Sequence, residues 1–177
     1  MPASSPAVST ASEVFHMGED LRTRIGRAVG RIASGVFVVT VRAGGECDGM
    51  LASWVSQAAF DPPMISVAIR KDRHLLRLMA PGSEFTLNVL SKDNLDIFKN
   101  FASPYVAGQD RFAGLEIESN STYGPVFCRS IAYLHLVTHT IVEAGDHVVA
   151  LAEVVDAGML QSEAEPMVHL RKNGFQY

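Results

Sequence analysis

The amino-acid sequence predicts a mainly β fold, a small barrel accompanied by a few helices in a single domain. Stretches rich in β-branched and aromatic residues recur along the chain, and short turns marked by Gly, Pro or Asp separate them. Only a few segments have helical character. Roughly seven strands with so few helices favour a small barrel over a parallel α/β sheet, in which helices alternate with strands.

The first half of the chain is predicted to contain a helix followed by strands. Apolar residues Leu21, Ile25 and Val29 lie at helical spacing, which predicts a helix over residues 19–32. Runs of β-branched and apolar residues predict strands over residues 35–43 and 64–70, and the stretch 49–57 is predicted to be a further strand, with turns at Gly44-Gly45 and Asp61-Pro62-Pro63 between them.

The second half is predicted to mix short helices with long strands. A short helix begins at His74 and ends at Pro81-Gly82, a strand covers residues 84–90, and a second helix covers residues 94–102. Residues 131–143 and 147–155 form a hairpin around Gly145-Asp146. Residues 166–177 form a last strand or an extended tail.

Length and composition restrict the class of protein. A chain of 177 residues suits one domain with a sizeable core. Its net charge of −4 argues against a nucleic-acid-binding surface, and no apolar run approaches the roughly 18–20 residues of a membrane helix. Two widely separated cysteines make no disulfide framework or zinc cluster. We therefore expect a soluble, cytoplasmic protein with neither a nucleic-acid nor a membrane partner.

The N-terminal residues differ in composition from the rest. Residues 1–18 are rich in serine and have neither the basic start nor the apolar centre of a secretory signal. They are expected to be a flexible tail, and residues 19–177 to be the folded domain.

The predicted strand over residues 49–57 has an unusual composition. A core strand favours bulky β-branched residues, but Ala52, Ser53, Ser56 and Gln57 crowd around Trp54, the only tryptophan of the chain. Small side chains let a flat ligand approach the backbone, and polar ones can hydrogen-bond to it. The strand is therefore a candidate binding site.

Two turns carry further candidate residues. Arg70, Lys71, Arg73 and His74 lie where a predicted strand is followed by a predicted helix, an arrangement that suits a phosphate; a solvated charged turn explains them equally well.

His147 follows the Gly145-Asp146 turn. Turn chemistry alone is the simpler explanation of this motif, and the alternative is a histidine at a cleft rim that contacts a substrate or manages a proton.

Other motifs point away from particular chemistries. His135 and His139 lie in a strand-like segment, where about 3.3 Å per residue would place them roughly 13 Å apart, too far for one metal. They are expected to be two partly buried strand histidines, and no metal site is predicted. The sequence has no GxGxxG, Walker A or GxSxG motif, so a nicotinamide cofactor would have to bind without a Rossmann subdomain.

Taken in order, these segments resemble the flavin reductase-like family of FMN-binding split barrels, most narrowly flavoredoxin and the flavin reductase module of cyanobacterial flavodiiron proteins. The matching segments are IASGVFVVTV (32–41), GMLASWVSQAAFDPP (49–63), ISVAIRKDRHLLRLM (65–79), FTLNVL (85–90), DRFAG (110–114), GPVF (124–127), GDHVVALAEVVDAG (145–158) and PMVHLRKNGFQY (166–177). The resemblance implies an FMN-binding split β-barrel with Greek-key-like connections, and a homodimer. Asp72 departs from the Ser or Thr of many members.

The resemblance also implies roles for residues. Leu51, Ala52, Ser53 and Trp54 would line the edge of the flavin ring, with Ser56 and Gln57 near the ribityl chain or its phosphate. Lys71, Arg73 and His74 would take the phosphate. His147 would lie beside the flavin where the nicotinamide stacks, as the candidate catalytic residue.

The function implied is an NAD(P)H-dependent flavin reductase that uses FMN, or alternatively FAD, and passes electrons to an acceptor such as a monooxygenase component. Two alternatives stay open. One is a non-enzymatic FMN electron carrier reduced by a protein partner. The other is a binding module that has lost the flavin.

Overall fold

A computed structural model describes residues 20–119 and 121–175, which divide into two compact units. The larger unit is Ser34–His169, and the described part of the smaller unit is residues 20–33 with 170–175. The expected tail, residues 1–18, lies outside the described residues, and the domain boundary at residue 19 stays a prediction. No helix within these described ranges is long and apolar enough to cross a membrane.

The smaller unit consists of the helix α2 (Leu21–Val29) and the C-terminal segment that packs against it. The Asp20 carboxylate caps the helix by accepting hydrogen bonds from the backbone N–H groups of Arg22 (2.7 Å) and Thr23 (3.3 Å). The C-terminal segment returns to donate from Gly174 N to Gly26 O (2.6 Å). The helix is shorter than the predicted 19–32, because it ends at a glycine, Gly30.

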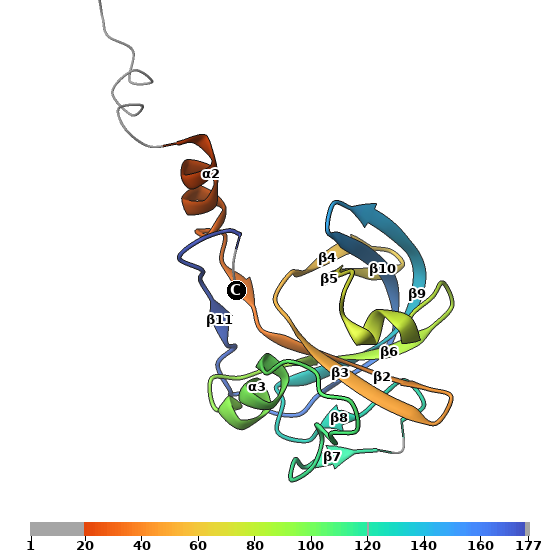
Figure 1. The fold of residues 1–177 in the computed structure, drawn as a ribbon. Helices are drawn as coiled ribbons and strands as arrows, with labels where there is room; N and C mark the ends of the chain where they lie inside the picture. Colours follow the sequence, from red (N-terminus) through yellow and green to blue (C-terminus); the bar gives the residue numbers. More distant parts are fainter. Residues whose placement is uncertain (1–19, 120, 176–177) are drawn as a thin grey trace, which may run out of the picture. The chain divides into compact units, whose positions relative to one another are not determined.

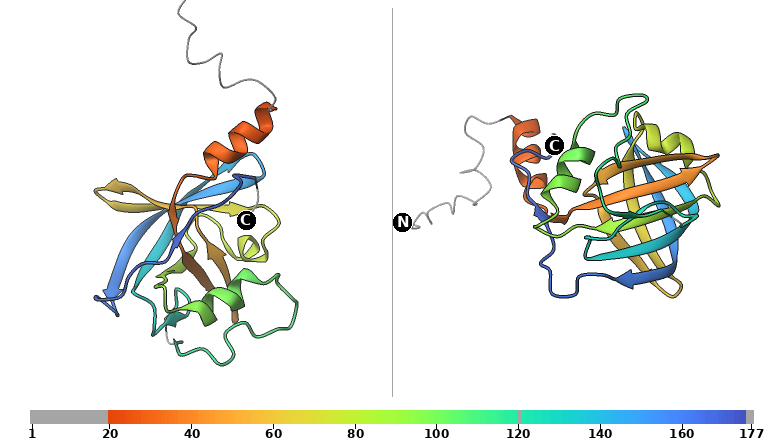
Figure 2. Two further views of the ribbon diagram at one scale, coloured as in Figure 1. Left: turned by 90° about the vertical axis from the view of Figure 1, so that its left-hand side faces the viewer. Right: turned by 90° about the horizontal axis from the view of Figure 1, so that it is seen from below.

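The larger unit is built on one antiparallel sheet with the strand order β3-β2-β6-β9-β10-β5-β4. Figures 1 and 2 show this sheet curling into a barrel. Its strands are β2 (Phe37–Ala43), β3 (Glu46–Ala52), β4 (Val55–Phe60), β5 (Pro63–Arg70), β6 (Glu84–Val89), β9 (Ala132–Ala144) and β10 (His147–Met159). The prediction of a mainly β barrel is confirmed.

Short elements complete this unit. Two-residue strands pair as β1 (Ser34–Gly35) with β11 (Val168–His169) and as β7 (Ile117–Glu118) with β8 (Val126–Phe127). The helices are η1 (His74–Leu78), which is 3₁₀ in type, and α3 (Leu95–Ala102). Of residues 166–175, expected to belong to a last strand or an extended tail, only Val168–His169 form a strand, and both predicted helices of this unit are present.

One predicted strand is wrong. Residues 49–57 were expected to be continuous, but they belong to β3 and β4, which lie at opposite edges of the sheet. Ser53 and Trp54 connect the two, and the Trp54 carbonyl accepts a hydrogen bond from Ala68 N at 2.9 Å. The chain turns here because it passes from one edge of the curled sheet to the other. We call these two residues the Ser53–Trp54 corner.

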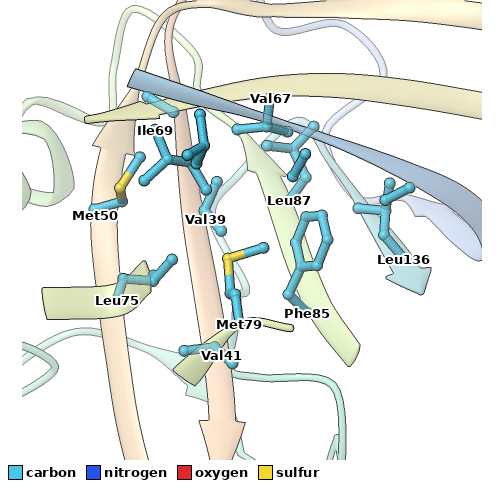
Figure 3. Close-up of a cluster of buried hydrophobic side chains, with 14 residues drawn as sticks. Val39, Val41, Met50, Val67, Ile69, Leu75, Met79, Phe85, Leu87 and Leu136 are labelled. Carbon is cyan, nitrogen blue, oxygen red and sulfur yellow. The ribbon is translucent and has the colours of Figure 1, made fainter. Parts of the chain in front are cut away.

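The apolar core has an inner and an outer part. The inner cluster fills the barrel between β2, β3, β5, β6, β9 and β10. Leu75 of η1 and Met79, the residue that follows η1, point into this cluster (Figure 3). The outer cluster joins Val38 of β2 to Phe101 of α3 and to Phe127. Because β2 is covered on both faces, residues Val38, Val39 and Val41 are all buried, instead of alternating between core and solvent.

Close packing of α3 depends on a glycine in β3. A Cβ atom added at Gly49 would lie 2.6 Å from Phe101 Cε1, closer than real Cβ atoms approach a neighbour. The missing side chain therefore lets the Phe101 ring rest on the strand backbone.

Candidate functional site

The Ser53–Trp54 corner meets His147, the first residue of β10. The Trp54 and His147 rings pack with their centroids 4.7 Å apart at an interplanar angle of 36°. His147 is 7% exposed, and its Nδ1 lies 2.8 Å from Asp146 Oδ1. The structure thus brings together two residues that are more than ninety positions apart in the sequence and that were predicted to share one site.

Two buried polar atoms at this place have no hydrogen-bond partner among the described residues. They are Ser53 Oγ and His147 Nε2. Buried polar side-chain atoms are nearly always satisfied, and an unsatisfied one costs about 1–3 kcal/mol. Ser53 precedes Trp54 in the chain and the His147 ring packs on Trp54, so both atoms are available to a polar ligand at this corner.

The neighbouring predicted residues face in different directions. Leu51 packs against the outer apolar cluster, whereas Ala52 is 5% exposed and belongs to the inner core. Ser56 and Gln57 are exposed on β4, where Ser56 Oγ donates to Gln57 O (3.3 Å) and Gln57 Nε2 donates to Ala59 O (3.3 Å). Only the last two therefore have side chains that reach solvent freely.

The basic turn over residues 70–74 adjoins the same site. His147 is the strand partner of Arg70, and Lys71 N donates to Asp146 O at 3.1 Å. The hydrogen bonds between the two turns therefore fix where the basic turn lies relative to His147.

Several charges of this turn are already paired. Arg70 binds Asp72 through two contacts of 2.7 and 2.6 Å, and the hydrogen bond from Arg70 lowers the pKa of Asp72. Lys71 forms an ion pair with Glu143. Arg73 has no ion-pair partner within the described ranges, and is the cation most available to an added anion.

His74 is held by β3. Its Nδ1 lies 3.0 Å from Asp48 Oδ2, and its Nε2 lies 3.7 Å from Glu46 Oε1. The His74 ring also stacks on Tyr105, with 4.4 Å between centroids and an interplanar angle of 5°. Both ring nitrogens thus face carboxylates, which sequence reasoning about the basic turn did not foresee.

Sequence reasoning also missed a pocket of about 320 Å³ between β3 and a later loop. Its lining residues are Glu46, Cys47, Asp48, Tyr105, Gly108, Gln109, Asp110, Arg111 and Phe112. The buried Arg111 guanidinium is engaged in this wall, because it donates to Gly49 O (2.9 Å) and Asn100 O (3.1 Å). The only signal in the sequence was the DRFAG segment, to which no role was assigned.

The two histidines of β9 have different surroundings. His135 is buried, its Nδ1 lies 3.0 Å from Thr86 Oγ1, and Tyr123 stacks on its ring. Burial lowers the pKa of His135. His139 is exposed, which corrects the expectation of a partly buried side chain, because the last residues of β9 extend into solvent. Within residues 20–119 and 121–175, no group of three or more His, Cys, Asp or Glu side chains could hold a metal.

Comparison with known proteins identifies the family. The model of the flavin reductase like domain matches residues 29–176, and the chain belongs to this family. The chain is 36% identical over 160 residues to diflavin flavoprotein A 1 of Synechocystis sp., covering 90% of this chain and 28% of that protein. It therefore spans little more than a quarter of the curated relative's length.

Solved structures agree with this assignment. The NADH:FAD oxidoreductase SgcE6 of Streptomyces globisporus superposes with a TM-score of 0.74 at 29% identity, covering 82% of this chain and 86% of that one. That enzyme has also been solved in complex with NAD and FAD fragments. The flavin reductase PheA2 superposes with a TM-score of 0.70 at 26% identity, covering 81% of this chain and 90% of that one.

Proposed function

We propose that the protein is an NAD(P)H-dependent flavin reductase that binds FMN at the Ser53–Trp54 corner. One observation carries the proposal: the unpartnered, buried Ser53 Oγ and His147 Nε2 beside the Trp54 ring. A planar ligand with polar edges fits this arrangement, because it can pack on an aromatic ring and satisfy both atoms. Flavin supplies the redox chemistry when bound, and the protein supplies binding and orientation.

The remaining corner residues have separate roles in this proposal. Leu51 and Ala52 would border the ring mainly through their backbone, because the Ala52 methyl group belongs to the inner core. Ser53 would exchange a hydrogen bond with a polar edge of the ring, and Trp54 would cover part of its surface. Ser56 and Gln57, which are exposed on β4, would contact the ribityl chain.

The phosphate of FMN would bind at the basic turn. Arg73 would contribute most, and Lys71 would exchange Glu143 for the phosphate. Exposed ion pairs contribute only about 0–1 kcal/mol, so this exchange is easy. His74 would have to give up Asp48 to join them, since its Nδ1 already lies 3.0 Å from that carboxylate.

His147 would contact the nicotinamide. Hydride leaves the nicotinamide directly, so this step needs no general base, and an imidazole here would orient the carboxamide or assist proton delivery to the reduced ring. The name of the similar Streptomyces enzyme, an NADH:FAD oxidoreductase, supports a nicotinamide donor. We propose FMN as the cofactor in preference to FAD. Either NADH or NADPH would serve as the hydride donor.

The assembly and setting of the protein are part of the same proposal. We expect a homodimer in the cytoplasm that passes electrons to an acceptor protein such as a monooxygenase component. Sedimentation that gives a single 19.2 kDa species at micromolar concentration would contradict the dimer.

A second candidate is a non-enzymatic FMN carrier reduced by a protein partner. The match to about a quarter of a larger diflavin flavoprotein favours it, because a module inside a larger protein can exchange electrons with its neighbours. Both candidates require flavin binding, but only the first requires reaction with a pyridine nucleotide.

Titration and steady-state kinetics test the proposal. Purified protein should alter the fluorescence of added FMN with saturation, and should then oxidise NADH or NADPH only when flavin is present. Saturable binding without oxidation of either nucleotide would support the carrier instead. Unchanged fluorescence with both FMN and FAD would reject both candidates.

A further inference from the structure

The imidazole of His147 is constrained on one side and open on the other. Its Nδ1 lies 2.8 Å from Asp146 Oδ1, while its buried Nε2 has no partner within the described ranges. An ionised carboxylate only accepts hydrogen bonds, so a neutral imidazole beside it must carry its proton on Nδ1. The other nitrogen is then a bare acceptor.

We propose that Asp146 is a positioning residue that fixes His147 as the Nδ1–H tautomer, so that Nε2 accepts a hydrogen bond from an N–H or O–H group of the ligand. The tautomer itself depends only on the Asp146–His147 contact. The identity of the donor rests on the proposed function: the amide NH₂ of the nicotinamide carboxamide is a suitable group. A carbonyl oxygen could not serve, because two acceptors do not hydrogen-bond.

The backbone holds Asp146 where this contact is possible. Gly145 has a φ of +64° at the turn, a conformation that glycine adopts without strain. Asp146 O accepts from Lys71 N (3.1 Å), and the next residue pairs with both Arg70 and Ala144. The Asp146 position is therefore tied to β5 and β9.

Charges around the pair favour an ionised Asp146. The hydrogen bond from His147 is the main cause that lowers the pKa of Asp146, and Arg70 adds to it. The other charged groups near the turn, Lys71 and Glu143, form an ion pair with each other. The carboxylate is thus an acceptor over the physiological pH range.

Ring-nitrogen NMR tests the tautomer without any ligand. Long-range ¹H–¹⁵N correlations of labelled protein at neutral pH distinguish Nδ1–H, Nε2–H and doubly protonated rings, and His147→Gln assigns the signal. We expect Nδ1–H in the wild type. We expect Nε2–H in Asp146→Ala, whose fold the same spectra report, and in Asp146→Asn, whose amide NH₂ can donate to an unprotonated Nδ1. A wild-type ring that is Nε2–H or doubly protonated, or a tautomer unchanged in Asp146→Ala, would overturn the proposal.

A substrate analogue tests the donor. In reduced 3-acetylpyridine adenine dinucleotide, a methyl group replaces the amide NH₂, so this donor is missing. We compare the ratio of kcat/KM for NADH to that for the analogue, because differences in intrinsic reactivity cancel between variants. One lost hydrogen bond predicts that the ratio is about 10- to 100-fold lower in both Asp146→Ala and Asp146→Asn than in the wild type.

These outcomes separate the inference from the proposed function. An equal ratio in all three proteins would reject the carboxamide as donor. If neither NADH nor NADPH is oxidised at all, the proposed function fails, and the NMR result still decides the role of Asp146.

Discussion

Replacing Arg73 with alanine should weaken FMN binding strongly while leaving riboflavin binding nearly unchanged, because riboflavin has no phosphate. A hydrogen bond between charged groups contributes about 1.5–3 kcal/mol, or roughly 10- to 150-fold in affinity. Arg73 has no ion pair to give up among the described residues, so it should contribute this amount in full.

Lys71→Ala should cost less. Lys71 is paired with Glu143, and the side chains are 44% and 75% exposed, so solvent already screens their interaction. Binding phosphate replaces that pair, which is worth about 0.2–1 kcal/mol, and the net contribution of Lys71 falls accordingly. Glu143→Gln should tighten FMN up to about 5-fold by freeing the lysine.

Fluorescence titrations of FMN and riboflavin against each variant measure these affinities. Arg77→Ala is the matched control, because it removes an exposed arginine from η1, the short helix that Arg73 precedes. Equal losses for FMN and riboflavin would show that Arg73 acts through folding. A loss in Arg77→Ala as large as in Arg73→Ala would show that only the general positive charge matters.

Three further predictions concern stability. Gly49→Ala should cost about 1–3 kcal/mol by overpacking against Phe101, as measured by urea unfolding, and Phe101→Leu should restore part of it; an unaffected midpoint would contradict the packing argument. Leu75→Ala should lower the free energy of unfolding by about 2–5 kcal/mol, which corresponds to roughly 4–20 °C in Tm for a chain of this size. A decrease in Tm below about 2 °C would show that Leu75 of η1 does not pack in the core. Because burial holds the pKa of His135 below 6.5, the unfolded chain binds this proton at a higher pH than the native state. Stability should therefore fall as the pH drops below about 6.5, and urea midpoints of His135→Gln should fall less steeply; identical slopes would contradict this.

Elements with strong local signals could be predicted from the sequence. The β-branched run of β2 and the long hairpin of β9 and β10 around Gly145-Asp146 both appear as expected. Local propensity and turn chemistry suffice there, since strand and turn preferences agree with the final packing.

The break at the Ser53–Trp54 corner could not be predicted in this way. It contains no Gly or Pro, and its neighbours on both sides are strand residues. The carbonyl of Trp54 is satisfied by Ala68, so the turn depends on the pairing of β4 with β5 and on the curl of the sheet. Such a tertiary cause leaves no local pattern in the sequence.

At the candidate site, too, some features could be predicted from the sequence and others could not. The basic turn and His147 could be selected from composition and turn position. Their partners could not, because Asp48 reaches His74 from a strand 26 residues earlier, and Tyr105 stacks on it from a later loop. Which charges are already paired depends on contacts that the linear order does not reveal.

Anaerobic mixing of the FMN-loaded protein with one equivalent of NADH or NADPH tests the central claim most directly. The proposed function predicts that at least one of the two nucleotides bleaches the visible absorbance of the bound flavin, and that His147→Ala slows this bleaching about 10- to 100-fold while still binding FMN. A flavin that stays oxidised with both nucleotides, yet is bleached by dithionite, would contradict the reductase and leave the electron carrier as the function of this fold.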